Sequence, residues 1–162
     1  MSKMKRIMSK KDLPGYTLLK QVLINLDLNN KDYIWLISDI EAYPSNKELE
    51  KEINEKGYLI LSTKELMSIL DEEDFQWIWG CLCGFTKDIP LEKVLSHPLP
   101  SAQDYNGYYQ NPLSLQHPLS SIEIIPCDSS WILVVSENKN LIDNYLAKYP
   151  TCEDLSSYNN KN

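Results

Sequence analysis

The chain has 162 residues and a net charge of −7, with 23 acidic residues against 16 Lys and Arg. A chain of this length is expected to form one domain that needs no disulfide or metal to fold. Phosphate contacts supply most nucleic-acid affinity and require Lys or Arg. The acidic balance therefore argues against nucleic-acid binding and is compatible with a basic partner. The one arginine, Arg6, lies in a basic N-terminal segment, so the body of the chain has none. Because arginine is the usual residue for bidentate phosphate recognition, its absence there argues against nucleotide and phosphoryl chemistry.

No segment of the sequence reads as a secretory signal, and no apolar run approaches the 18 residues of a membrane span. We therefore expect a cytoplasmic protein that does not contact a membrane. In that compartment the four cysteines, Cys81, Cys83, Cys127 and Cys152, are expected to be reduced.

The first half of the chain alternates helix and strand patterns. Residues 1–11 are basic and without periodicity, and they are predicted to be a flexible tail. A helix capped by Asp12, with Pro14 in its first turn, is followed by a strand over Tyr33–Ile40. Ser45 is predicted to cap a charged surface helix over residues 46–56, with Glu48 completing a capping box.

A short apolar strand, Tyr58–Leu61, leads into a helix that begins at Ser62 and stops at an acidic run. The run is Asp71-Glu72-Glu73-Asp74. Acidic residues at a helix C-terminus oppose the helix dipole at a cost of a few tenths of a kcal/mol each. The run is therefore either a solvated loop or a negative patch directed at a basic partner.

The most apolar strand pattern is Phe75–Phe85. One face carries Phe75, Trp77, Trp79, Cys81, Cys83 and Phe85, and the other face includes Gly80 and Gly84. Both faces are largely apolar, which predicts a strand covered on both sides. Glycines inside a strand often mark a close approach, so we expect a helix, or alternatively a ligand, against their face.

Residues 96–120 are rich in proline, tyrosine and serine and contain His-Pro-Leu at both 97–99 and 117–119. Such a long loop is often functional or disordered, and its tyrosines argue against simple disorder. A hairpin follows, with strands Ser121–Cys127 and Trp131–Val135. A helix capped by Asn138 ends at Pro150, and residues 156–162 are predicted to be a flexible tail.

These elements predict one α+β domain over residues 1–162. Its sheet is expected to have four or five strands, mostly antiparallel, with helices packed on it.

Cys81 and Cys83 are the first candidates for chemistry. They point to one face, with Cα atoms about 6.6 Å apart, which is near the upper limit for a disulfide. They could begin a metal site with two further ligands from among His97, His117, Cys127 and Cys152, or one of them could form a nucleophilic pair with His97 or His117. The simpler interpretation is that both thiols are small buried hydrophobic groups.

Four carboxylates stand at or near strand ends: Asp39, Glu41, Glu123 and Asp128. A paired-carboxylate site would require two of them within about 5–10 Å. The sequence contains no phosphate-binding glycine loop and no Gly-x-Ser-x-Gly or His-Glu-x-x-His motif.

Two functions of different class remain. The first is a non-enzymatic acidic protein-binding module, because tyrosine and tryptophan dominate binding hot spots and complementary charge raises association rates. Its predicted contacts are Asp71, Glu72, Glu73, Asp74, Tyr105, Tyr108 and Tyr109, and neither a cofactor nor a metal is expected. The alternative is an enzyme or a small-ligand or metal-binding protein that uses the Cys81/Cys83 strand face with His97 or His117.

Several short segments of the sequence resemble segments of small uncharacterised proteins of low-GC bacteria. They are Tyr33-Ile-Trp-Leu-Ile, Gln76-Trp-Ile-Trp-Gly, Ile122-Glu-Ile-Ile and Asp128-Ser-Ser, followed by a helix that ends in Tyr149-Pro150. Some of these proteins resemble immunity proteins, which neutralise a toxin. The resemblance extends over most of residues 30–158 and implies an acidic inhibitor that docks on a toxin domain without catalysis of its own.

Overall fold

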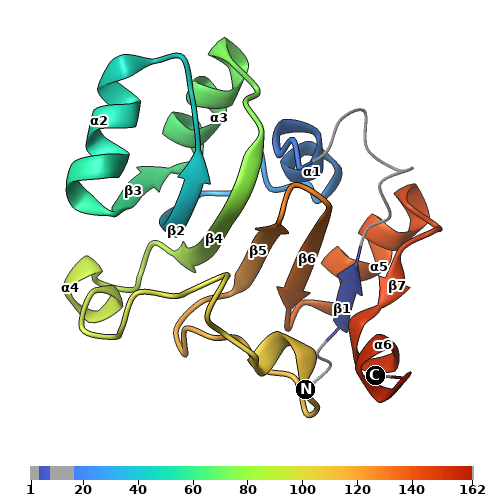
Figure 1. Ribbon diagram of the computed structural model, residues 1–162. Coiled ribbons are helices and arrows are strands. Elements are labelled where there is room, and N and C mark those ends of the chain that lie inside the picture. Colours follow the sequence, from blue (N-terminus) through green and yellow to red (C-terminus); the bar gives the residue numbers. More distant parts are fainter. Residues whose placement is uncertain (1–3, 8–16, 162) are drawn as a thin grey trace.

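The computed structural model describes residues 4–7 and 17–161, which fold around one antiparallel sheet (Figure 1). The strands are β1 (Met4–Ile7), β2 (Tyr33–Ala42), β3 (Tyr58–Ser62), β4 (Trp77–Thr86), β5 (Ile122–Cys127), β6 (Trp131–Ser136) and β7 (Glu153–Asp154). The helices are α1 (Lys20–Asn25), α2 (Lys47–Lys56), α3 (Thr63–Glu72), α4 (Leu91–Val94), α5 (Lys139–Lys148) and α6 (Leu155–Lys161), with a 3-10 turn at Gly107–Tyr109.

The strand order is β3-β2-β4-β5-β6-β1-β7, and every neighbouring pair is antiparallel. The predicted α+β fold is confirmed, since the strands β3-β2-β4-β5-β6 form the expected five-stranded antiparallel sheet. The short strands β1 and β7 extend this sheet on one side. None of the described helices is long and apolar enough to cross a membrane.

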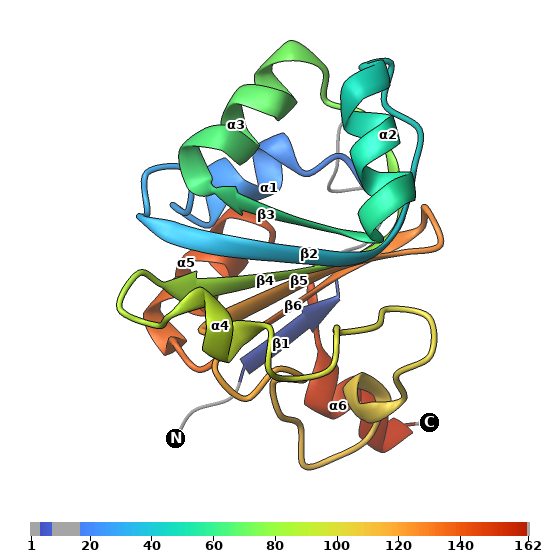
Figure 2. The same cartoon turned by 90° about the vertical axis from the view of Figure 1, so that its left-hand side faces the viewer.

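Each face of the sheet has its own apolar core. Helices α1, α2, α3 and α5 cover one face, where residues such as Trp35, Leu66 and Ile142 pack together (Figure 2). The other face is covered by α4, α6 and the 96–120 loop, over a second core that contains Leu133 and Leu155. The sheet is therefore the middle of three layers, and a loop supplies much of the third layer.

The strand β4 does not keep one side-chain alternation along its length. Phe75 and Trp77 belong to the helix-side core, whereas Cys81, Cys83 and Phe85 belong to the loop-side core. The pairing between β2 and β4 is irregular around Trp79, which shifts the alternation by one residue. The prediction that Phe75, Trp77 and the cysteines share one face is therefore wrong.

The glycines of β4 face rings from the sheet itself and not a helix. A Cβ atom added at Gly84 would lie 2.9 Å from the Ile122 side chain and 3.1 Å from the Trp35 ring. One added at Gly80 would lie 3.1 Å from the Trp77 ring. The close approach predicted from the glycines is present, but aromatic side chains of β2 and β4 occupy the space that was assigned to a helix.

Local capping explains where three helices begin. Asn138 accepts from the Leu141 amide at the start of α5, as predicted. Helix α3 begins where predicted, and the structure adds a reciprocal capping box between Ser62 and Glu65. The predicted cap of α2 is wrong by one residue, because Asn46 and not Ser45 accepts from the first-turn amides. Ser45 instead donates to a carboxylate of the acidic run.

The structure differs from the two predicted tails. Residues 4–7 form β1, which pairs with β6 from Met4↔Ser136 to Ile7↔Leu133. Most of residues 156–162 belong to α6, whose first turn is capped by Asp154 and whose Leu155 is buried. The sequence of β1, Met-Lys-Arg-Ile, does not alternate apolar and polar residues, so no period-two pattern marks this strand. The rest of the predicted N-terminal tail and the predicted cap Asp12 with Pro14 lie outside the described residues.

Candidate protein-binding surface

The acidic run at the end of α3 is where the sequence predicts contacts with a partner. Asp71 and Glu72 are exposed, while Glu73 and Asp74 are partly covered. Asp71 forms an ion pair of 3.0 Å with Lys20. Glu72 is the member of the run for which the described residues provide no hydrogen-bond or ion-pair partner, and its side chain is exposed.

Two members of the run also have structural roles. The Glu73 carboxylate accepts hydrogen bonds from the Ser45 amide at 2.7 Å and the Ser45 hydroxyl at 2.8 Å, and these bonds lower its pKa. Asp74 accepts a bond of 3.3 Å from the Lys20 amide, and partial burial raises its pKa. Glu73 therefore fixes the β2–α2 connection beside the end of α3, and Asp74 fixes α1 there.

The connection that Glu73 fixes carries Tyr43, which at 71% relative exposure is the most exposed large hydrophobic side chain among the described residues. Its chain neighbour Pro44 lines a small cavity with Glu72 and Glu73, so the backbone of this connection lies near the acidic run. We call Tyr43, Asp71, Glu72 and Glu73 the acidic-aromatic surface. Tyr43 is not among the contacts predicted from the sequence, although an aromatic residue directly before a proline after a predicted strand is a recognisable signal.

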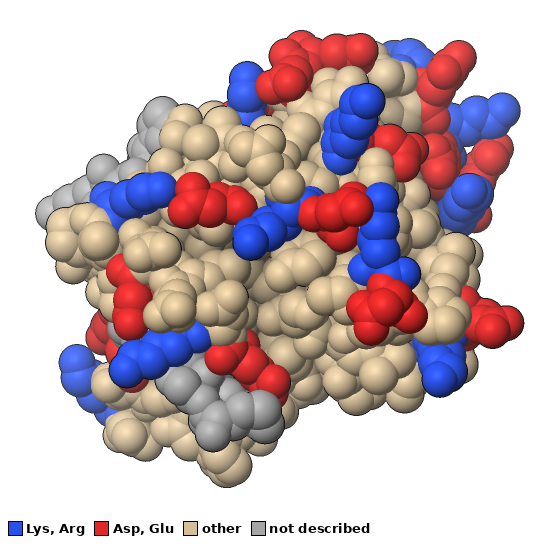
Figure 3. Space-filling model, turned by 180° about the vertical axis from the view of Figure 1, so that it is seen from behind, with Lys and Arg blue, Asp and Glu red and all other residues tan. Residues whose placement is uncertain are grey.

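The charge of the chain is concentrated around this surface. Residues 41–76 contain ten acidic and four basic residues, a net charge of −6 out of −7 for the whole chain. Three of the four lysines pair with glutamates inside α2, over 3.3–3.8 Å. In the view from behind, acidic side chains gather towards the top and right, over the part of the molecule that holds α2 and α3, with lysines among them (Figure 3).

The tyrosines of the 96–120 loop do not form one exposed patch. Tyr108 is fully buried and donates a hydrogen bond of 2.7 Å to Glu123, so the prediction that it contacts a partner is wrong. Burial strongly raises the pKa of Tyr108. Tyr105 packs edge-on against the Tyr108 ring, and Tyr109, at 37% exposure, retains a modest accessible surface.

Tyr108 is buried because the loop is fastened to a carboxylate of the sheet. Glu123 on β5 has no exposed surface and accepts from Tyr108, from the amides of Gln116 and His117, and from the Ser120 hydroxyl, all over 2.7–2.9 Å. A buried charge is tolerated only when it is paired or fully hydrogen-bonded. Four donors from one loop meet this condition, and they hold the loop on the sheet.

A second carboxylate fastens the other part of the loop. Asp39, at a positive φ of 50° within β2, accepts from the Ser101 hydroxyl and the amides of Ala102 and Gln103 over 2.7–3.1 Å. Burial opposes ionisation, but these bonds and one from the Gln103 side chain outweigh it and lower the pKa of Asp39. Asp39 and Glu123 each have their own set of loop donors, which gives both a structural role in ordering the loop.

The Cys81/Cys83 face, the basis of the alternative function, lies under this loop. The two sulfur atoms are 3.9 Å apart and both thiols are buried. Burial raises the pKa of Cys83 well above its usual value and that of Cys127 to about 12. A thiolate is the reactive and metal-binding form, so Cys83 and Cys127 are held in their inert thiol form.

The histidines do not join the thiols in a metal site. The rings of His97 and His117 lie against each other with centroids 4.9 Å apart. His117 Nδ1 accepts from the Leu119 amide at 3.1 Å, so Nε2 carries the proton and donates to the Val94 carbonyl at 2.9 Å. Both ring nitrogens are thus engaged, and the described residues contain no group of three or more His, Cys, Asp or Glu side chains arranged for a metal ion.

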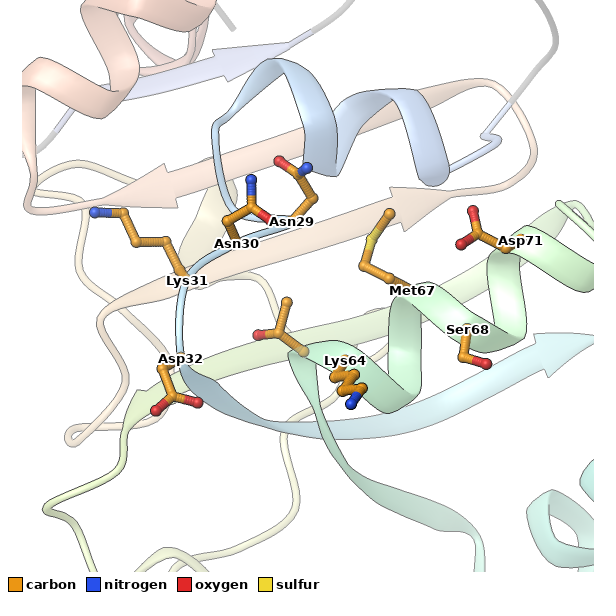
Figure 4. A pocket seen from close by; sticks show the side chains of 9 residues that line it. Asn29, Asn30, Lys31, Asp32, Lys64, Met67, Ser68 and Asp71 are labelled. Atoms are coloured by element: carbon orange, nitrogen blue, oxygen red, sulfur yellow. The ribbon is translucent and has the colours of Figure 1, made fainter.

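An open cleft of about 550 Å³ lies between the α1–β2 connection and α3 (Figure 4). Its polar side chains diverge: Lys31 and Asp32 point away from Met67 and Asp71. Asp32 is paired with Lys87 at 2.6 Å, and Asp71 with Lys20. A catalytic centre requires groups that converge on one reacting atom, and this cleft does not provide them.

No family model, no curated protein and no solved structure matches the chain. Function is therefore inferred from the chain's own residues.

Proposed function

We propose that the protein is a non-enzymatic binding module that docks a basic protein partner on the acidic-aromatic surface. The observation that carries this proposal is Tyr43, an aromatic side chain at 71% exposure on the connection that Ser45 bonds to Glu73 of the acidic run. Exposed single hydrophobic residues are ordinary, but a tyrosine held in place within a charged rim has the composition of a binding hot spot.

The local structure supports this role because the surface is preorganised. Bonds from Ser45 to Glu73 hold the connection that carries Tyr43 against the end of α3, so little conformational entropy remains to be lost on binding. Glu72 supplies an exposed carboxylate near the same connection, and none of the residues that the structure describes pairs with it. A lysine or arginine of the partner would pair with Glu72 while an apolar side chain packs on the Tyr43 ring.

The resemblance to immunity proteins implies one kind of partner, a basic toxin domain whose active surface the bound module would cover. Such a partner would need an excess of Lys and Arg opposite the end of α3. The long-range attraction between the two charges would speed association and weaken as salt is raised.

The test is site-specific photo-cross-linking with a benzophenone amino acid at position 43, in cells of the native organism. Position 91 is the matched control, because Leu91 is also exposed, at 46%, but lies on α4 over the opposite face of the sheet. We expect a basic protein to be cross-linked from position 43 and not from position 91. Glu72→Lys should abolish the product, while Glu92→Lys, the same charge change on α4, should leave it.

Failure to cross-link from position 43, or equal products from positions 43 and 91, would refute the proposed surface. Equal loss with Glu72→Lys and Glu92→Lys would show that only the overall charge matters.

A further inference from the structure

The strand β3 is the outer strand on the helix-rich side of the sheet (Figure 1). It pairs with β2 from Ile34↔Ser62 to Ser38↔Tyr58, and within the described ranges no strand lies on its other side. An edge strand presents unpaired N–H and C=O groups, which proteins commonly protect with a charge, a proline or a bulge. The sequence of β3, Tyr-Leu-Ile-Leu-Ser, contains neither a charge nor a proline.

The phase of the hydrogen bonds identifies which residues face outward. Thr63 Oγ1 lies 3.4 Å from both the backbone nitrogen and the backbone oxygen of Tyr33, so Tyr33 turns its backbone groups towards the β3 side. The backbone N–H and C=O groups of successive residues in a strand point to opposite sides. Counting back from Thr63 in steps of two, the residues of β3 whose backbone groups point to β2 are Leu61 and Leu59.

The alternate residues of β3 direct their backbone N–H and C=O groups outward, away from β2, and these are Tyr58, Ile60 and Ser62. The Ser62 amide agrees with this, because it donates to the Glu65 carboxylate at 3.0 Å instead of to β2. Tyr58 and Ile60 therefore offer two N–H and two C=O groups to an added strand.

The two sides of this edge differ in chemistry. On the helix side, Leu61 lines a groove of about 490 Å³ between α2 and α3, whose charged residues are Glu48, Glu52, Glu65 and Lys64. Seen from the β3 side, both α2 and α3 stand above β3 (Figure 2). On the loop side, the half-buried side chains of Tyr58 and Ile60 form an apolar border.

We infer that the partner adds an extended segment to β3 as a further strand, with basic side chains towards the α2–α3 groove and apolar side chains beside Tyr58 and Ile60. Alternate residues of a strand point to opposite faces, so the segment alternates basic and apolar residues. This inference rests on the proposed function and specifies how the same partner is held. A second copy of the chain fits less well, because pairing two β3 strands would bring together two helix layers that both carry net negative charge.

The test measures amide exchange in the ¹⁵N-labelled full chain with the peptide Ac-Val-Lys-Val-Lys-Val-Lys-Val-NH₂ as the probe. We expect exchange at Tyr58 and Ile60 to slow by about tenfold or more, while Leu59 and Leu61, already paired with β2, do not change. The same peptide with glutamate in place of lysine should have no effect.

A matched pair of variants separates the backbone from the side chain. Ile60→Pro removes an outward N–H and leaves the β2 ladder intact, so the probe should bind at least about tenfold more weakly. Ile60→Ala also loses the isoleucine side chain but keeps the backbone N–H, so binding of the probe should persist. If Ile60→Pro is unstable, the exchange pattern of the unaltered chain with the two peptides decides.

Unchanged exchange at saturating probe would refute strand addition, and so would equal binding by the two variants. Protection of Tyr58 and Ile60 without any probe, lost on dilution, would show that a second copy occupies the edge and would also refute it. A partner cross-linked from position 43 whose binding is unaffected by Ile60→Pro would leave the proposed function standing and refute this inference alone.

Discussion

Replacement of Glu123 by alanine is expected to release the 96–120 loop from the sheet. The carboxylate accepts four hydrogen bonds from that loop at zero exposure. Bonds to a charged group contribute about 1.5–3 kcal/mol each, so four give an upper bound of about 6–12 kcal/mol. Removal of the carboxylate also removes its desolvation cost, so the net loss of stability is smaller than this upper bound. Breaking a buried charged network typically costs about 3–5 kcal/mol.

We therefore expect Glu123→Ala to lower the free energy of unfolding by about 3–5 kcal/mol, measured by urea denaturation. Amide exchange should show the loss of protection concentrated in the loop. Glu137→Ala, at an exposed position just after β6, is the control and should have little effect. If Glu123→Ala does not fold, Glu123→Gln keeps one acceptor oxygen and should lose about 1–3 kcal/mol. A loss below about 1 kcal/mol in both variants, with loop protection unchanged, would refute this role.

Three further outcomes are expected. Gly84→Ala should destabilise the protein by about 1–3 kcal/mol, seen as a lower urea midpoint, because its Cβ would press on the Trp35 ring; an unchanged midpoint would contradict this packing. Burial, with a smaller contribution from His97, holds the pKa of His117 below 6.5, so the unfolded chain binds the proton first. Stability should thus fall as pH drops from about 7 to 5, and His117→Gln should flatten that slope if the sign is right. Asp39→Ala should speed amide exchange at residues 101–103, and the contribution of Asp39 to stability should vanish as pH falls through its lowered pKa; exchange as slow as in the unaltered chain would argue against this anchor.

The sequence predicts those parts of the fold that depend on local patterns. The four tryptophans lie in strands, as predicted, because period-two runs of aromatic and β-branched residues survive in any sheet order. Ser62 and Asn138 begin helices as predicted, because a cap depends on residues two or three positions away.

What the sequence does not predict depends on distant segments. Glu123 alternates with Ile122 and Ile124, a pattern that normally places a carboxylate in solvent, yet the 96–120 loop covers it. The irregular pairing near Trp79 changes the face of β4 through its contact with β2, which no property of β4 alone reveals. The same holds for Tyr108, whose burial follows from its bond to Glu123.

The sequence predicts the acidic part of the candidate site but not its aromatic part. The acidic run is recognisable because carboxylates at a helix C-terminus oppose the helix dipole. The aromatic member of the surface, Tyr43, lies on another segment of the chain. The bonds from Ser45 to Glu73 hold the connection that carries Tyr43 near the run, and bonds across 28 positions cannot be predicted from one sequence.

The most direct test of the binding role is calorimetric titration of the partner that is cross-linked from position 43. We predict that Tyr43→Ala weakens binding by about 2 kcal/mol or more, roughly 30-fold, as expected at a hot spot. Leu91→Ala, the matched exposed control, should leave the affinity unchanged. Equal affinities for the unaltered chain and Tyr43→Ala would contradict the central claim.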